Sequence, residues 1–224
     1  MGLSIVIQIY RVDSMHIPWG IVMMMAMGSI FLASNAAAQN VITDQVAITS
    51  EQGKLFGLTS GEGISREFLA SGEDVLVIEA KGVTGFVQTS TRLLGFSGRL
   101  NRWVDLTLPT GEQIIKWKVT SRMIVVQGRK AAYGFQSDRG RWKREPWGAG
   151  ESLKTSAVKA HIAVMVTNRR ALGFSAFTGG FFSRDLPAGN QIQEIEINDN
   201  VVILHLSGFM LVFRSGLAIW AELP

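Results

Sequence analysis

The fold is decided by the stretch Arg92-Leu93-Leu94-Gly95-Phe96-Ser97-Gly98-Arg99-Leu100-Asn101-Arg102-Trp103-Val104-Asp105, because this stretch is one copy of a unit that recurs every 39 residues. Its two aromatic residues define columns along the chain, namely Phe96, Phe135, Phe174 and Phe213, and Trp103, Trp142, Phe181 and Trp220. A third column has the same period and consists of Gly72, Gly111, Gly150 and Gly189. Self-similarity at a fixed period of this length indicates a propeller, a solenoid or an array.

One repeat contains four short runs typical of β-strands. The runs cover residues 84–89, 92–97, 102–108 and 113–119, and they are separated by clusters of Gly, Pro, Ser and Asn. Runs of this length that are rich in β-branched and aromatic residues predict strands joined by hairpins. Four strands per repeat predict one blade of a β-propeller, and no helix is expected after residue 39.

The polarity of the runs predicts their order within a blade. The first run is apolar on both faces in each copy, as in residues 162–166, which favours the innermost position. The fourth run alternates, as in residues 191–197, which favours the outer rim, where charges discourage edge-to-edge pairing. This order predicts five blades, the last of which ends at residues 218–223 without an outer strand. We expect Val41-Ile42-Thr43 to pair beside that strand and to close the ring.

The chain resembles the tryptophan-aspartate type of propeller repeat. The resemblance rests on Trp103-Val104-Asp105 and Trp220-Ala221-Glu222, and on the turn Thr110-Gly111-Glu112 that follows the first of them. It covers residues 40–224 and implies an all-β propeller of four-stranded blades that is closed by an N-terminal outer strand. The five blades counted from the repeats depart from this type, whose usual blade number is higher. The Gly-His pair expected before the inner strand is replaced, for example by Lys81-Gly82. Five-bladed relatives include small lectins and glycoside-cleaving enzymes, which is an analogy of fold.

Residues 1–38 have the features of a secretory signal peptide. Arg11 precedes an apolar run over residues 17–32, which ends in Ala36-Ala37-Ala38. A basic start, a short apolar core and small residues at the end predict cleavage after Ala38, leaving residues 39–224 as the propeller. Two alternatives remain open: an uncleaved membrane anchor, and a true start at Met15. With cleavage, we expect a periplasmic or secreted protein with no membrane span.

The composition limits the chemistry and the partners. The chain has no cysteine, which excludes disulfides, thiolate metal sites and a cysteine nucleophile. A net charge of +4 and a pI near 9.6 permit binding to anionic surfaces. For an exported protein, we expect an anionic glycan or an acidic protein partner, and no nucleic acid.

Departures from the repeat suggest a binding surface. Loops that enter the first strand and loops that join the second and third strands lie at the same end of a blade. They carry a set of basic residues: Lys81, Arg99, Arg102, Arg122, Arg139, Arg141, Lys159 and His161. Only Asp138 and Asp199 oppose them. We predict that this set binds an anionic group, since arginine offers a bidentate fork to carboxylate, sulfate or phosphate; the alternative is a set of solvated surface residues.

The aromatic residues have two interpretations. An aromatic residue kept in every copy, as in the Trp103 column, favours packing between neighbouring sheets over sugar stacking. Phe177 and Phe182 belong to an apolar loop that occurs in one copy only. They are candidates for contact with a partner, and the alternative is that the loop folds over its own blade.

No catalytic motif is present. After the leader the only histidines are His161 and His205, and neither has a sequence-adjacent nucleophile. Glycoside hydrolysis requires two facing carboxylates, and the sequence nominates no pair. The sequence therefore favours a non-enzymatic binding module without cofactor or metal. A structural, protein-interaction subunit of a cell-envelope assembly is the alternative, and a glycoside-acting enzyme is the third.

Overall fold

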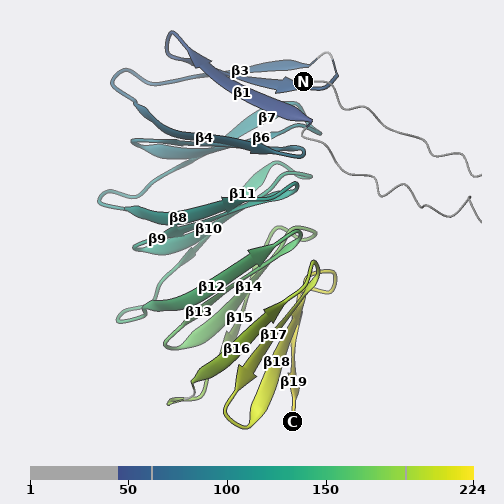
Figure 1. The fold of residues 1–224 in the computed structure, drawn as a ribbon. Coiled ribbons are helices and arrows are strands. Elements are labelled where there is room, and N and C mark those ends of the chain that lie inside the picture. Colours follow the sequence, from purple (N-terminus) through teal and green to yellow (C-terminus); the bar gives the residue numbers. More distant parts are fainter. Residues whose placement is uncertain (1–44, 62, 190) are drawn as a thin grey trace, which may run out of the picture. The chain divides into compact units, whose positions relative to one another are not determined.

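A computed structural model describes residues 45–61, 63–189 and 191–224. In these residues the regular secondary structure is entirely β, in five antiparallel sheets that follow one another along the chain (Figure 1). The prediction of an all-β chain built from five blade-like sheets, the units of a β-propeller, is confirmed. A helix that could span a lipid bilayer is not found among the described residues.

The first three sheets cover residues 46–146. Sheet 1 consists of β1 (Val46–Glu51), β2 (Lys54–Thr59) and β3 (Ile64–Phe68). Sheet 2 consists of β4 (Val75–Lys81), β5 (Thr84–Thr89), β6 (Arg92–Ser97) and β7 (Arg102–Thr107). Sheet 3 consists of β8 (Ile114–Val119), β9 (Met123–Gly128), β10 (Ala131–Gln136) and β11 (Arg141–Pro146).

The last two sheets cover residues 153–223. Sheet 4 consists of β12 (Leu153–Lys159), β13 (Ile162–Thr167), β14 (Arg170–Ser175) and β15 (Phe181–Asp185). Sheet 5 consists of β16 (Ile192–Ile197), β17 (Val201–Leu206), β18 (Phe209–Arg214) and β19 (Ile219–Leu223). In the described residues every sheet is a meander in which sequential strands pair.

The predicted division into blades is wrong by one strand. The run at 113–119 was assigned to the rim of the preceding blade, but β8 pairs with β9 of the next repeat. Three residues, 120–122, join these two strands, whereas six residues, 108–113, separate β7 from β8. A short connection favours pairing of its flanking strands, so the longer turn is the one that crosses between sheets.

This shift also changes the interpretation of the first and last sheets. The prediction that the last blade lacks its fourth strand is wrong, because β16 pairs with β17 and sheet 5 therefore has four strands. The sheet with three strands among the described residues is sheet 1. The predicted pairing of residues 41–43 beside 218–223 lies outside the described residues and stays a prediction, as does the leader.

One glycine of each repeat lies in the turn that connects a sheet to the next one. These residues are Gly72, Gly111, Gly150 and Gly189. The φ angle is positive in all four copies, between 68° and 82°. In this region of the backbone a Cβ is unfavourable, so only glycine adopts the turn without strain. The third column of the repeat therefore marks the crossing between sheets.

Consecutive sheets pack face to face through a second glycine. Gly57, Gly95, Gly134 and Gly173 occupy one repeat position, and each lies under the phenylalanine ring of the following sheet. A Cβ built on Gly95 would lie 2.6 Å from Phe135 Cε2, so any larger residue would push the sheets apart. The phenylalanine column thus fills a cleft that the glycine leaves open.

The tryptophan column joins the same interfaces. Trp103 Nε1 donates to the carbonyl of Ser65 at 3.3 Å, Trp142 Nε1 to that of Val104 at 3.0 Å, and Trp220 Nε1 to that of Phe182 at 2.8 Å. Each acceptor belongs to the preceding sheet. The prediction that this column packs between sheets is confirmed.

Burial distinguishes the central sheets from the first and last ones. All residues of β9, β10 and β13 are buried, because sheets 3 and 4 are covered on both faces. In sheet 5, β17 alternates between buried and half-buried residues. In sheet 1, β3 alternates between half-buried and exposed ones. Each of these two sheets therefore has one face packed on a neighbour and one face that is more open.

Candidate functional site

The predicted basic residues gather at one end of the sheets. We call this the loop end; it contains the β2–β3, β4–β5, β6–β7, β8–β9, β10–β11, β12–β13, β14–β15, β16–β17 and β18–β19 turns. It carries all of the predicted ligand-binding residues: Lys81, Arg99, Arg102, Arg122, Arg139, Arg141 and His161. The antiparallel meander explains the grouping, because alternate turns of a meander fall at the same end. The sequence thus predicted the grouping, although it assigned strands to the wrong blades.

Two arginines at equivalent repeat positions bridge neighbouring sheets. Arg102 Nη2 donates to the carbonyls of Arg139 at 3.1 Å and Gly140 at 3.3 Å, in the turn of the next sheet. Arg141 Nη2 donates to the carbonyl of Thr178, again in the next sheet. Carbonyl oxygens orient a guanidinium without neutralising its charge. These two arginines therefore retain a full positive charge.

Asp138 neutralises part of the positive charge of the loop end. Its Oδ1 lies 3.0 Å from Arg99 Nε and its Oδ2 lies 3.6 Å from Arg122 Nη1. Lys159 Nζ lies 3.9 Å from Asp199 Oδ1. Among the described residues, Lys81 and Arg139 are exposed and make no ion pair. The loop end thus keeps an excess of positive charge.

His161 occupies a more enclosed part of the loop end. Its ring centroid lies 5.1 Å from that of Phe177, and its Nδ1 is buried without a hydrogen-bond partner among the described residues. Burial lowers the pKa of His161 and the nearby Arg122 charge lowers it further, against the opposing effect of Asp199 and Asp138. His161 is therefore neutral near pH 7 and does not add to the positive charge.

The loop that carries Phe177 is fixed from the neighbouring sheet. Gln136 Nε2, which is buried, donates to the carbonyls of Ala176 at 2.8 Å and Phe177 at 2.7 Å. Phe177 remains 36% exposed. Phe182, in contrast, packs against the core between sheets 4 and 5, with its ring 6.0 Å from that of Phe213. Of the two predicted partner-binding residues, only Phe177 presents a substantially exposed ring.

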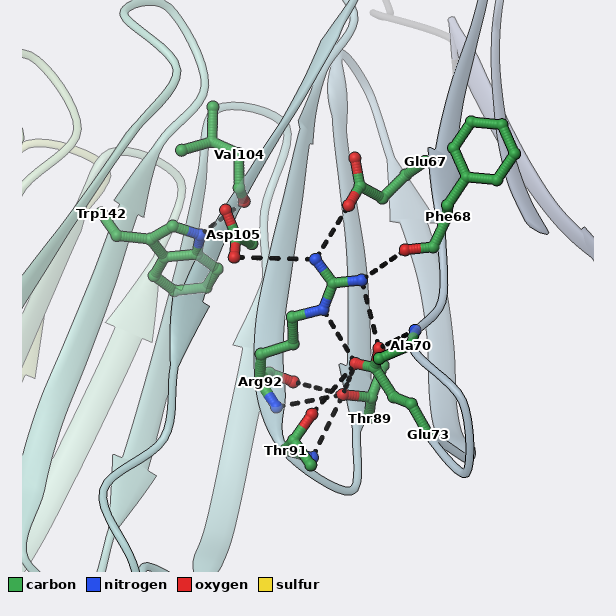
Figure 2. Close-up of polar contacts among 10 residues, drawn as sticks. All are labelled: Glu67, Phe68, Ala70, Glu73, Thr89, Thr91, Arg92, Val104, Asp105 and Trp142. Carbon is green, nitrogen blue, oxygen red and sulfur yellow. Dashed lines mark hydrogen bonds and ion pairs between the residues drawn. The ribbon is translucent and has the colours of Figure 1, made fainter. Parts of the chain in front are cut away.

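The opposite end of the sheets contains an ion-pair cluster centred on Arg92, whose partner Glu73 is buried (Figure 2). Arg92 lies 2.8 Å from Glu73 Oε1 through Nε and 2.8 Å from Glu67 Oε1 through Nη1. Its Nη2 donates to the carbonyl of Phe68 at 2.6 Å. Glu67 and Phe68 belong to sheet 1, and Arg92 to sheet 2, so the cluster joins the two sheets (Figure 2).

The charges of this cluster are matched. Burial by itself would raise the pKa of Glu73, but hydrogen bonds from Arg92, Thr89 and the Ala70 N–H outweigh it and lower that pKa to about 2. The pKa of Arg92 is raised, chiefly by its hydrogen bond to Glu73. Both groups therefore stay ionised over the whole physiological range, and their roles are structural.

The same cluster recurs two repeats later. Arg170 lies 2.8 Å from Glu151 and 2.7 Å from Glu145, and it donates to the carbonyl of Pro146 at 2.9 Å. The intervening copy has Ala131 at the arginine position, and its Glu112 instead accepts from the Tyr133 hydroxyl. The sequence signal of this cluster is a period of two repeats, which relates Arg92 to Arg170 and Glu67 to Glu145.

Among the described residues, one group has the spacing of metal ligands. Glu194, Glu196 and His205 lie on the open face of sheet 5, with ligand atoms within 4.8 Å of one another. His205 Nε2 lies 2.8 Å from Glu196 Oε1. Both glutamates are exposed and the histidine already has a partner, so the group is explained as a cross-strand polar contact.

The described surface has shallow hollows. One of about 250 Å³ opens at the loop end between sheets 1 and 2, and its lining includes Thr59, Gly98 and Arg99. Small-molecule pockets typically enclose roughly 300–1,000 Å³. The loop end is therefore better suited to an extended ligand lying across it than to an enclosed small molecule.

Comparisons with known proteins give fold-level matches only. No protein-family model matches the chain, and neither does any curated protein. Among solved structures, HIRA residues 644–1017 match with a TM-score of 0.37 and 13% identity, over 80% of this chain and 53% of that one. Hsv2 of Kluyveromyces lactis matches with a TM-score of 0.34 and 10% identity, over 66% and 50%. The extracellular domain of BT4673 from B. thetaiotaomicron matches with a TM-score of 0.34 and 11% identity, over 79% and 27%.

This chain spans about half or less of the structures named above. At such identities and TM-scores, the matches say nothing about ligand or partner. The assignment of the fold rests instead on the strand pairing and on the packing between consecutive sheets.

Proposed function

We propose that the chain is a non-enzymatic binding module that holds an anionic glycan across its loop end. The observation that carries the proposal is the pair Arg102 and Arg141. These side chains occupy one repeat position in neighbouring sheets, and carbonyl groups orient both without neutralising their charge. A guanidinium that is fixed in place loses less conformational freedom when an anion binds.

The spacing of the arginines favours a repeating ligand. Sheets packed face to face lie about 10 Å apart, so equivalent side chains of neighbouring sheets recur at roughly that distance. Lys81 and Arg139 lie at the same end of these two sheets and are exposed, which enlarges the positive surface. A polymer with one anionic group per repeat unit would meet successive cations along the row.

Export is part of the same proposal. Residues 1–38 act as a signal peptide, which places the module in the periplasm or outside the cell, where acidic polysaccharides occur. An acidic protein partner is the alternative ligand, since it offers the same carboxylates. Glycoside cleavage is less favoured, because both aspartates of the loop end, Asp138 and Asp199, are held in ion pairs.

A second candidate function is docking to a protein of a cell-envelope assembly. The 36% exposed ring of Phe177 favours it, because Gln136 fixes the loop that presents this ring. Docking through an aromatic ring depends weakly on ionic strength, whereas binding through arginines weakens as salt screens the charges. The two functions therefore differ in a property that is simple to measure.

The test is titration calorimetry with a sulfated polysaccharide and with its desulfated form. We expect the sulfated form to bind, Arg102→Gln with Arg141→Gln to weaken binding by about tenfold or more, and added salt to weaken it further. Arg129→Gln is the matched control, since Arg129 is exposed at the opposite end of sheet 3. Equal binding of both polysaccharides, or equal effects of the two sets of substitutions, would contradict the proposal.

A further inference from the structure

The interfaces inside the molecule follow one packing pattern. Toward the following sheet each sheet presents a glycine, and toward the preceding sheet each presents a phenylalanine. The four pairs are Gly57 with Phe96, Gly95 with Phe135, Gly134 with Phe174, and Gly173 with Phe213. Each interface therefore has two different sides, one with a cleft and one with a ring.

The two ends of the series depart from this pattern in a complementary way. The strand register places Val212 of sheet 5 at the glycine position, because it precedes Phe213 in β18 as Gly173 precedes Phe174 in β14. The register likewise places Leu58 of sheet 1 at the phenylalanine position, directly after Gly57 in β2. A larger residue replaces glycine and a smaller one replaces phenylalanine, so a contact between Val212 and Leu58 would fill a similar total volume.

Both open faces are apolar. The open face of sheet 1 carries Phe56, Leu58, Ile64 and Phe68, of which Ile64 is 60% and Phe68 is 64% exposed. The open face of sheet 5 carries Ile203, Met210, Ile219 and Leu223, of which Ile219 is 52% and Leu223 is 43% exposed, while Val212 in the middle of these rows is 5% exposed. Large apolar side chains gathered on one face are typical of an interaction surface.

The charges on the two faces are of opposite sign. On sheet 1, Lys54 Nζ lies 5.8 Å from the Phe68 ring centroid and Arg66 Cζ lies 5.9 Å from that of Phe56, and Glu51 is the only acid in these rows. On sheet 5, Glu194 and Glu196 stand in the same rows as the apolar residues, and Arg214 is the one opposing cation. Opposite net charges favour contact of these two faces over contact of either face with itself.

We propose that the open face of sheet 5 in one copy packs against the open face of sheet 1 in a second copy of this chain. The contact continues the stacking of sheets from one copy into the next. A second copy is the favoured occupant because Ile64 and Ile219 are more than half exposed, so the two faces do not cover each other within one chain. The surfaces differ from the loop end, and the proposal goes beyond anion binding.

Such a contact is heterologous, since each copy contributes a different face. It therefore leaves one unused face at each end of a pair, and further copies add until the series closes. The full-length chain should accordingly form species larger than a dimer as its concentration rises. Sedimentation velocity over a concentration series measures this directly.

Two single substitutions separate the faces. Ile64→Asp should inactivate the face of sheet 1, and Ile219→Asp that of sheet 5, so each variant alone should remain a monomer. An equimolar mixture should give a 1:1 heterodimer and nothing larger, because only one intact pair of faces remains. Ile115→Asp is the control, since Ile115 is 64% exposed on β8, outside both faces, and it should assemble as the unsubstituted chain does.

A second pair of variants tests the volume argument. Leu58→Phe should weaken assembly by about tenfold, because a phenylalanine requires glycine at the opposing position. Val212→Gly combined with Leu58→Phe should restore assembly, since it recreates the internal pattern. Circular dichroism checks that each variant is folded. If Leu58→Phe acted only by disturbing the fold, the added Val212→Gly substitution would not restore assembly.

Two results would overturn the proposal. One is a monomer at every concentration, with a melting temperature that falls in Ile64→Asp, which would assign the two faces to closure within one chain. The other is self-association that Ile64→Asp and Ile219→Asp leave unchanged, which would assign assembly to another surface.

Discussion

Arginine has different partners at the two ends of the sheets. At the end opposite the loops, Arg92 and Arg170 each meet two glutamates, of which Glu73 and Glu151 have side chains only 1% and 3% exposed. At the loop end, the partners of Arg102 and Arg141 among the described residues are backbone carbonyls. An arginine matched by buried carboxylates contributes to joining two sheets, whereas one held by carbonyls keeps its charge available for a ligand. The partner, rather than the residue type, thus distinguishes a structural arginine from a binding one.

The largest effect is expected for Arg92→Met. This substitution keeps the aliphatic part of the side chain but leaves Glu73 buried without its cation. Breaking one partner of a buried ion pair costs about 3–5 kcal/mol, because the remaining charge is uncompensated. Urea unfolding monitored by tryptophan fluorescence should therefore show a free energy of unfolding lower by roughly that amount.

The double variant Arg92→Met with Glu73→Gln is its control. It removes the orphaned charge together with its partner and should recover much of the lost stability. If both variants are equally unstable, the cost lies in the lost bonds to Glu67 and Phe68 and not in the buried charge.

The next largest effect is on the free energy of unfolding at acid pH. The pKa of Glu73 in the folded chain is lowered to about 2 from its ordinary value of 4.5. A lowered pKa gives stability that is fully present above pH 4.5 and is lost as the pH falls through about 2. In Arg92→Met the hydrogen bond and the charge of Arg92 are lost, so the pKa of Glu73 is higher than in the unsubstituted chain and less stability depends on its ionisation. The stability difference between the two chains should shrink as the pH falls from 6 to 2.

Urea unfolding at several pH values measures that difference. The cluster of Arg170 and Glu151, where the pKa of Glu151 is also lowered, is present in both chains and cancels in the subtraction. A difference that stays constant over this range would show that the Arg92–Glu73 pair does not couple folding to protonation.

Much of the fold could be predicted from the sequence because the same packing residues recur at the same position of each repeat. The Phe96, Trp103 and Gly111 columns each have a single structural role in every copy, and periodicity alone reveals such roles. The division into blades could not be predicted as securely, because a strand such as 114–119 is adjacent in sequence to two possible partners. Its alternation of polar and apolar residues suits either edge of a sheet, and only the pairing with β9 decides between them.

The candidate site was less predictable for a related reason. The grouping of Arg102 and Arg141 followed from the meander, but their carbonyl partners in the next sheet depend on how neighbouring sheets are placed. Phe182 illustrates the same point, since its sequence context did not distinguish an exposed ring from one packed on Phe213. The partners of Arg92 in sheet 1, Glu67 and Phe68, are hard to recognise from the sequence because the full cluster has a period of two repeats, which a comparison of single copies hides.

The smallest effect on stability is expected at the loop end, for Arg141→Met. Arg141→Met removes a hydrogen bond to the carbonyl of Thr178, which lies at an exposed site where water replaces the lost donor. The free energy of unfolding should therefore fall by about 1 kcal/mol or less, far below the loss in Arg92→Met. Binding of the sulfated polysaccharide should respond in the opposite order, with a large loss in Arg141→Met and little change in a still-folded Arg170→Lys. An Arg141→Met variant as unstable as Arg92→Met would show that the carbonyl-bound arginines, too, hold the sheets together.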